Sequence, residues 1–168
     1  MKKLLCYLNV RKVLLPVLCL LCTGPALFAV QTTAMEIEAL LASDAVTYAQ
    51  ASRFVLEASG AAVFADPAQA FDYAMERNWL PGNASPNDPA RLDGLSLLLM
   101  QSFGLRGGIM FTLTGSAHFA YREMEHLGFI HGRISPGQRV SGDTLLYLTG
   151  RLLGHTEEYD ILENQDEQ

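Results

Sequence analysis

Histidine and glutamate side chains in the second half of the chain have the types and spacing that could bind a metal ion. Glu123 and His126 are three residues apart, which places both on one face of a helix, a spacing that can chelate a metal. With His118 and His131 they form a candidate site for metal-dependent hydrolysis. A dinuclear site would need a second Glu-x-x-His, and neither this nor His-Glu-x-x-His occurs. We therefore favour the alternative, a solvated helix face that holds no metal and no cofactor.

Arginine side chains are the candidates for ligand binding. Arg91, Arg133 and Arg139 lie in or beside polar loops, together with His131. A guanidinium group suits the recognition of carboxylate or phosphate groups. Ion pairing with the abundant neighbouring acidic residues is the alternative. We expect these four residues to form the ligand-binding face.

Covalent catalysis finds little support in the sequence. After residue 34 the chain contains neither lysine nor cysteine, which excludes Ser-Lys dyads, Schiff bases and thiolate nucleophiles from that part. The chain also lacks the Gly-x-Ser-x-Gly elbow of serine hydrolases. We therefore predict a protein that is not an enzyme and has no catalytic residues.

The first 34 residues have the order of a secretory signal peptide. A cationic start precedes an apolar run over residues 13–21, and small residues follow, with cleavage expected after Ala29 or Ala34. The cationic residues are Lys2, Lys3, Arg11 and Lys12. An uncleaved anchor is the alternative, although the run is short for a membrane span, which needs about 20 residues. We expect an exported protein of the periplasm, cell envelope or exterior, in contact with the membrane only if this segment is retained.

The charge of the remaining chain excludes several partners. Eight arginines stand against eighteen acidic residues after residue 34, a formal charge of −10. Nucleic acids and anionic membranes attract cationic surfaces, so neither is an expected partner. The length suits one domain over residues 35–154, and the acidic residues 155–168 suggest a solvated, frayed tail.

Helix signals recur along this domain and would position the candidate residues. Thr47 with Gln50 forms a capping box, and Asp66 before Pro67 is an N-cap followed by proline at the first helical position. Further helices are expected to open at Asp93, Ser116 and Ser141, the last ending at Gly154. A short helix is expected over residues 35–41. Residues 107–113 alone suggest extended structure, which we expect to be a linker packed on the helices because one strand cannot form a sheet.

An internal repeat relates the two halves of the domain. Residues 70–82 align with residues 120–132, and Ser85-Pro86 with Ser135-Pro136, at a spacing of fifty. A loop shorter by two residues would then place Arg91 on Arg139. The segment from Val46 matches only the second helix of this unit. The sequence thus predicts an all-α fold of about two and a half helix-loop-helix units, whose second helices, near Phe54, Leu98 and Leu146, pack together.

These units resemble the S-layer homology (SLH) repeat. Gly128-Phe129-Ile130-His131-Gly132 matches the family's Gly-hydrophobic-hydrophobic-x-Gly turn, and residues 78–82 match it with asparagine first. The family's second helix begins with Thr-Arg-Ala-Glu, and the segments aligned to it, at residues 47–50, 93–96 and 141–144, lack this arginine and glutamate. The resemblance implies attachment to cell-wall glycan.

Three function classes follow from these observations. We expect a non-catalytic binding or scaffold module whose partner is a cell-wall glycan or an envelope protein. The first alternative is a metal-dependent hydrolase built on His118, Glu123, His126 and His131. The second is a purely structural envelope protein.

Overall fold

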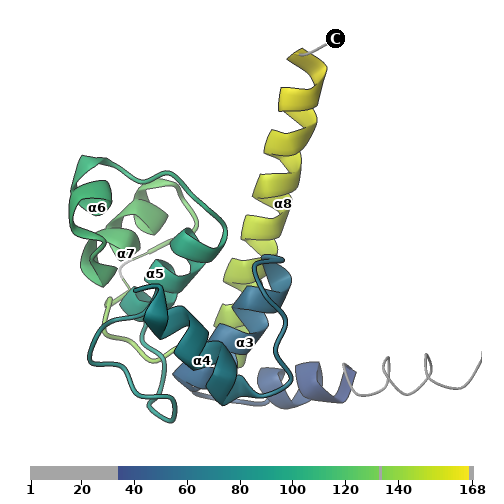
Figure 1. Cartoon of the computed structure of the whole chain (residues 1–168), viewed down its shortest axis with the longest axis vertical. Coiled ribbons are helices and arrows are strands. Elements are labelled where there is room, and N and C mark those ends of the chain that lie inside the picture. The colour runs from purple at the N-terminus through teal and green to yellow at the C-terminus, as the bar shows by residue number, and fades with distance from the viewer. Residues whose placement is uncertain (1–33, 133, 167–168) are drawn as a thin grey trace, which may run out of the picture. The chain divides into compact units, whose positions relative to one another are not determined.

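The part of the chain that can be described is helical. The computed structural model describes residues 34–132 and 134–166, and among them it contains helices and no strand, which confirms the all-α prediction (Figure 1). The predicted signal segment, except for Ala34, and Arg133 lie outside these residues. Residues 34–41 are helical, as expected, and the chain from Leu40 onward forms one compact unit. Its helices are α3 (Tyr48–Ala58), α4 (Pro67–Glu76), α5 (Leu92–Ser102), α6 (Ile109–Thr114), α7 (Ala117–His126) and α8 (Gly142–Asp166).

Several helix starts form as the sequence predicts. The Thr47 hydroxyl accepts from the Gln50 N–H while the Gln50 side chain accepts from the Thr47 N–H, which completes the capping box of α3. Asp66 caps α4 by accepting from the Ala68 N–H. These caps satisfy backbone donors that have no partner inside a helix.

The start of α5 differs from the prediction, because its N-cap is Arg91 and not Asp93. The backbone N–H groups of Leu92 and Asp93 donate to the carbonyls of Gln138 and Pro136 in a neighbouring loop, both at 2.9 Å. A tertiary contact therefore satisfies the donors that a capping side chain would otherwise take, and the helix can begin earlier.

The expected extended linker over residues 107–113 is wrong from Ile109 onward, where the chain forms α6. The Thr112 N–H donates to the Gly108 carbonyl and the Gly115 N–H to that of Phe111, which are helical bonds. Gly115 ends the helix at a φ of 56°. Glycine populates this left-handed region without strain. A strand here would have left these backbone groups without a sheet partner.

The predicted end of the last helix at Gly154, with a frayed tail, is also wrong. Helix α8 runs from Gly142 to Asp166, through Gly150 and Gly154. A glycine inside a helix costs only about 1 kcal/mol relative to alanine, and the following leucines, glutamates and glutamine have good helix propensity. The acidic segment is therefore helical as far as residue 166.

The helices pack in pairs around one core. Helix α3 packs against α4, α5 packs against α7, and α3 also contacts α5 and α8 (Figure 1). The expected central packing of the second helices is confirmed for α3 with both of the others. Leu56, Leu98 and Leu145 are fully buried on these three helices.

Three backbone segments meet in a closed ring of hydrogen bonds at the helix starts. The Val46 N–H donates to the Val140 carbonyl (2.9 Å), that of Val140 to Ala90 (2.9 Å), and that of Ala90 to Val46 (2.8 Å). All three residues are at most 1% exposed. Buried backbone groups need partners, and here each segment supplies one to the next. The ring places the N-termini of α3, α5 and α8 side by side.

The ring corrects the alignment of the loops. Ala90 and Val140 occupy corresponding positions in it, so the spacing of fifty continues through the loop without the expected two-residue deletion. The turn bonds from Asp88 to Ser85 and from Gln138 to Ser135 keep the same spacing. Arg91 therefore corresponds to Ser141, and Arg139 to Pro89.

Burial follows the same spacing of fifty residues. Helices α4 and α7 each have ten residues and begin fifty residues apart. The corresponding pairs Ala70 and Ala120, Phe71 and Tyr121, Ala74 and Met124, and Leu80 and Ile130 are all at most 6% exposed.

Candidate functional site

A polar groove lies where the starts of α3 and α5 meet the loops that precede α5 and α8. It has a volume of about 530 Å³. Its polar lining comprises Tyr48, Asn83, Asp88, Arg91, Asp93 and Arg139. An isolated backbone bridge between Arg91 and Arg139 brings the two arginines to the same groove. Two of the four predicted ligand-binding residues therefore lie together.

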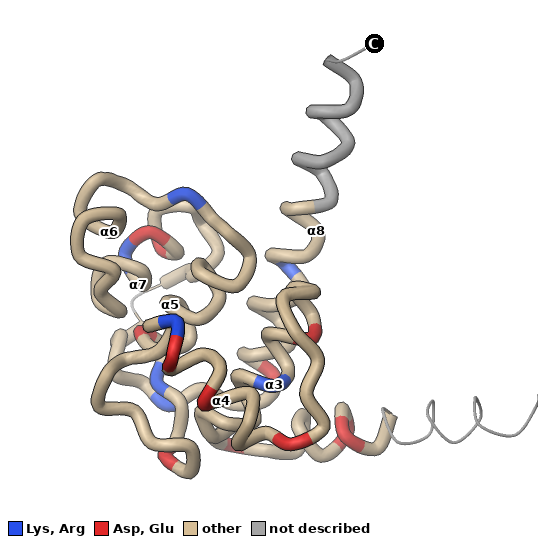
Figure 2. Tube along the Cα trace, in the orientation of Figure 1, with Lys and Arg blue, Asp and Glu red and all other residues tan. Residues whose placement is uncertain are grey.

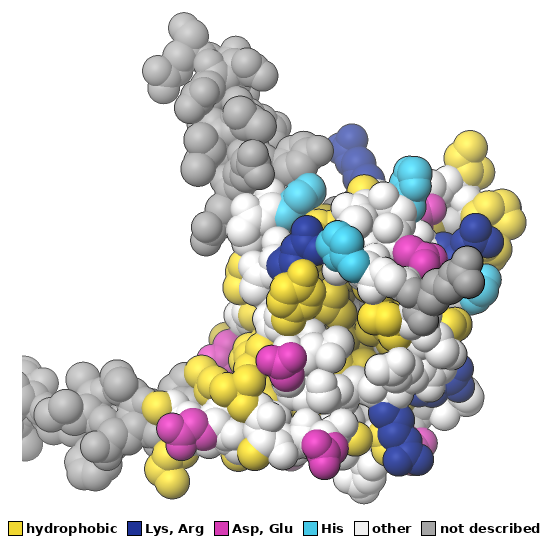
Figure 3. All heavy atoms as spheres, turned by 180° about the vertical axis from the view of Figure 1, so that it is seen from behind, with side chains coloured by type: hydrophobic (Ala, Val, Ile, Leu, Met, Phe, Trp, Pro, Cys, Tyr) yellow, Lys and Arg dark blue, Asp and Glu magenta, His cyan; other side chains and the backbone are white. Residues whose placement is uncertain are grey.

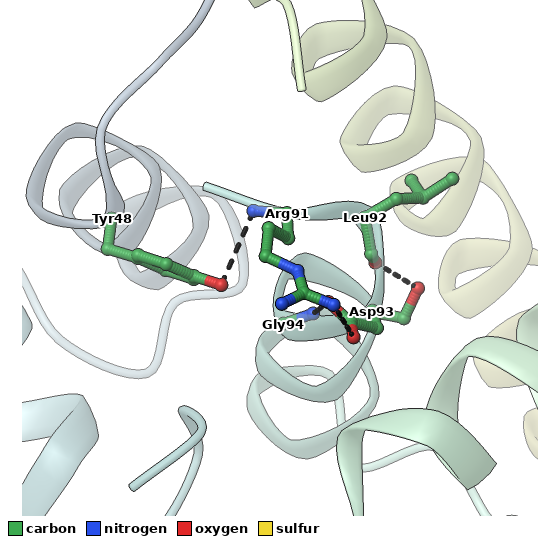
Figure 4. Close-up of polar contacts among 6 residues, drawn as sticks. Tyr48, Arg91, Leu92, Asp93 and Gly94 are labelled. Atoms are coloured by element: carbon green, nitrogen blue, oxygen red, sulfur yellow. Dashed lines mark hydrogen bonds and ion pairs between the residues drawn. The ribbon is translucent and has the colours of Figure 1, made fainter. Parts of the chain in front are cut away.

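Arg91 is held in place by both its backbone and its side chain (Figure 4). Its N–H donates to the Tyr48 hydroxyl at 3.3 Å, and its guanidinium pairs with the Asp93 carboxylate at 3.1 Å. Basic and acidic residues are interspersed along the described part of the chain (Figure 2). The other Asp93 oxygen accepts from the Gly94 N–H at 2.8 Å. Arg91 therefore contributes a charge that is already partly neutralised.

Tyr48 forms a buried wall of the groove. The ring lies against Gly94, where any Cβ would overlap the tyrosine hydroxyl. Burial raises the pKa of Tyr48 above its ordinary value, and Asp93 adds to this, while the hydrogen bond from Arg91 acts in the opposite direction. The phenol is thus kept neutral and can offer a hydroxyl to a ligand.

Arg139 is the cation of this groove that remains available. Its side chain is exposed and, among the described residues, has no hydrogen-bond or ion-pair partner. A guanidinium without a partner at a groove can bind an anionic or polyhydroxylated ligand with charge-assisted hydrogen bonds.

A second, smaller cavity of about 200 Å³ lies between the loop over residues 129–140 and the first turns of α8. Its buried floor includes Phe129, Ile130, Val140 and Leu148. Its rim includes His131, Gln138, Arg139 and Asp143. Arg139 lines both cavities, while the predicted residue His131 lines only this one.

The two cavities correspond to each other residue by residue. Five lining positions of the groove recur in the second cavity after fifty residues. The pairs are Pro81 and His131, Ala84 and Ile134, Asp88 and Gln138, Pro89 and Arg139, and Asp93 and Asp143. The second cavity thus has a histidine and an arginine where the first has prolines.

Arg151 organises the side of the second cavity that includes His131. Its guanidinium donates to the Gly128 carbonyl at 2.8 Å and lies 3.4 Å from Nδ1 of His131. It also stacks near the rings of Phe129 and Tyr147. Figure 3 shows histidine and arginine side chains next to one another on this face, above a group of hydrophobic side chains. His131 is therefore held by an arginine and not by an acidic residue.

The residues of the candidate metal site are not brought together. His118 packs against the ring of Phe119, Glu123 lies beside Gly108, and His131 lies beside Arg151. Within the described residues, no group of three histidine, cysteine or acidic side chains is placed to hold a metal ion. The Glu-x-x-His spacing on α7 is thus present without the further ligands that a site would require.

Sequence patterns did not single out Tyr48, Asp93, Asp143 or Arg151 as site residues. Tyr48 and Asp93 reach the groove from positions 45 residues apart, and no local motif connects them. Both residues lie in the first turn of a helix that begins at the hydrogen-bonded ring. This shared position would identify them as site residues, but it becomes visible only when the ring is known.

The comparisons with known proteins add no assignment to these cavities. Among the helices that the structure describes, none combines the length and the apolar character needed to cross a membrane. No protein-family model, curated protein or solved structure matches this chain.

Proposed function

We propose that this chain is an exported, non-catalytic binding module of the cell envelope, and that its polar groove holds a cell-wall glycan. The observation that carries the proposal is the groove of about 530 Å³, whose lining combines Arg139, which has no side-chain partner among the described residues, with the polar groups of Tyr48, Asn83 and Asp88. An envelope protein partner and a purely structural role are the competing assignments.

The arrangement of the backbone supports an SLH-like repeat architecture. The ring of Val46, Ala90 and Val140 joins three helix starts by equivalent hydrogen bonds. Helices α4 and α7, and likewise α5 and α8, begin fifty residues apart. Two and a half helix-loop-helix units account for this pattern, with α3 as the second helix of an incomplete first unit. Fold analogy does not by itself establish a ligand, so the function depends on the groove.

The chemistry of the groove suits a sugar that carries an acidic group. Asn83, Asp88 and the Tyr48 hydroxyl offer donors and acceptors for sugar hydroxyls. Arg139 offers a fork of N–H donors to a carboxylate or phosphate. Against a formal charge of −10 for the chain after residue 34, this guanidinium is a local anchor for an anionic polymer.

Sedimentation of the exported protein with isolated cell walls tests the proposal. Wall binding should weaken by about tenfold in the variant Arg139→Ala, because a charge-assisted hydrogen bond contributes roughly 1.5–3 kcal/mol. Added salt should weaken binding of the unchanged protein, since an exposed charge is screened within about 10 Å at 0.1 M ionic strength.

Arg122→Ala is the matched control, because Arg122 is an exposed arginine of α7 that lines neither cavity. This variant changes the net charge equally and should bind walls like the unchanged protein. Equal loss in both variants would indicate nonspecific electrostatic binding and contradict the proposal. Wall binding unaffected by Arg139→Ala would remove Arg139 from the site.

A further inference from the structure

The smaller cavity has an apolar interior that the glycan groove lacks. Five buried apolar side chains from α5, α8 and the loop before α8 line it: Leu92, Phe129, Ile130, Val140 and Leu148. Ala84 of the larger groove corresponds to Ile134 of this cavity, and the larger isoleucine adds apolar surface. An interior of this kind favours an apolar group of a ligand.

The rim of this cavity carries two opposite charges that do not neutralise each other. Arg139 and Asp143 both line the cavity and both are exposed. They are not within ion-pair distance of each other, and among the described residues neither has another ion-pair partner. A cation and an anion therefore stand apart at the mouth of an apolar cavity.

The corresponding cavity shows a different arrangement of the same positions. There Pro89 takes the place of Arg139, and Asp93, which takes the place of Asp143, is paired with Arg91 at 3.1 Å. The carboxylate at this position of the larger groove is thus neutralised by Arg91. Asp143, in contrast, has no ion-pair partner among the described residues and is left for a ligand of the smaller cavity.

We propose that this cavity binds a single apolar α-amino acid in its zwitterionic form. Arg139 would donate hydrogen bonds to the α-carboxylate, and Asp143 would accept hydrogen bonds from the α-ammonium group. The apolar side chain would enter the cavity over Phe129 and Leu148. A volume of about 200 Å³ suits one such residue and not an oligosaccharide.

Isothermal titration of the full chain with leucine and its analogues tests this site. Leucine should bind, whereas N-acetyl-leucine, which lacks the ammonium group, and 3-methylbutylamine, which lacks the carboxylate, should each bind about tenfold more weakly or worse. Glutamate should bind more weakly than leucine because it places a charge in the apolar interior. If leucine does not bind up to about 10 mM, or if N-acetyl-leucine binds equally well, the proposal is wrong.

Two charge variants and one control assign the binding to these residues. Arg139→Ala and Asp143→Asn should each weaken leucine binding by about tenfold. Asp93→Asn removes the corresponding carboxylate of the other cavity and should leave leucine binding unchanged. Circular dichroism verifies that each variant is folded. If a variant does not fold, the ligand analogues still test the site on the unchanged protein. Equal weakening by Asp93→Asn would overturn the assignment.

The amino-acid site and the glycan groove can fail separately. Asp143 lines only the smaller cavity, so Asp143→Asn should leave wall binding intact while it weakens leucine binding. Loss of wall binding in this variant would show that the two cavities form one site and would contradict a separate amino-acid pocket.

Discussion

At the scale of single residues, the candidate site depends on which charges the chain neutralises itself. Arg91 and Asp93 satisfy each other, whereas Arg139 and Asp143 have no ion-pair partner among the described residues. Sequence spacing predicted Arg91, Arg139 and His131 as site residues, and the structure places all three at the two cavities. Sequence spacing could not predict which of these charged residues form ion pairs, because this depends on which helix turn faces which loop.

Tyr48 leads to a prediction about alkaline pH. Burial raises its pKa, so as pH rises the phenol ionises in the unfolded chain before it ionises in the folded one. Protons are then released on unfolding, and the free energy of unfolding should fall as pH rises above about 10. Urea denaturation at neutral and alkaline pH measures this loss, which should be smaller in Tyr48→Phe.

Tyr147→Phe is the control for this prediction, because it removes a phenol that is 54% exposed. It should show the full alkaline loss of stability. Tyr48→Phe should also be less stable at neutral pH by about 1 kcal/mol, because the Arg91 N–H loses its acceptor. An equal alkaline loss in both variants would show that Tyr48 is not the responsible group and would point to Tyr121, whose pKa burial also raises.

At the scale of elements, helix starts with a local capping signal were predictable, whereas the start of α5, the end of α8 and the short helix α6 were not. Each of the predictable starts has a capping side chain that forms a local hydrogen bond, and the residue type is recognisable in the sequence. The capping residues are Thr47, Asp66 and Ser141. The continuation of α8 beyond Gly154 has no such local mark, because one glycine lowers helix stability only slightly. The start of α5 depends on a loop that is distant in sequence.

The helical conformation of α6 can be tested by the spacing of its buried side chains. In a strand, Ile109, Phe111 and Leu113 would lie on one face and be buried alike. In the structure Phe111 is 6% exposed, while Ile109 is 85% and Leu113 is 79% exposed. Phe111→Ala should therefore lower the free energy of unfolding by about 3 kcal/mol. Leu113→Ala should change it by less than about 0.5 kcal/mol.

Thermal or urea denaturation of the two variants measures this difference. If Leu113→Ala destabilised the protein as much as Phe111→Ala, the two side chains would share a buried face, as in the extended linker that the sequence suggested. Similar small effects in both variants would show that the segment does not contribute to the core.

At the scale of the whole molecule, the sequence predicted helix-loop-helix units but not how their segments close on one another. The spacing of fifty residues was visible, yet Val46, Ala90 and Val140 share no distinctive residue type. Their common property is a pair of backbone hydrogen bonds, which side-chain patterns do not encode. For this reason the loop alignment inferred from the arginines was shifted by two residues.

The closure of the ring is tested at Gly142, where the first and last segments meet. The Gly142 N–H donates to the Ser43 carbonyl at 3.0 Å, and a Cβ at this glycine would overlap the backbone carbonyl of Leu40. A backbone carbonyl cannot turn aside as a flexible side chain can, so the segments would have to separate. Gly142→Ala should therefore destabilise the protein by at least about 2 kcal/mol, measured by urea denaturation.

Gly150→Ala in the same helix is the matched control, because a Cβ there has open space and alanine favours the helix. This variant should be more stable by about 0.5–1 kcal/mol. The opposite signs separate a steric requirement at the ring from the general effect of replacing glycine in α8. If both variants were more stable, the close approach of Leu40 to Gly142 would not hold the first segment to the last. The ring would then not be the feature that unites the three helix starts.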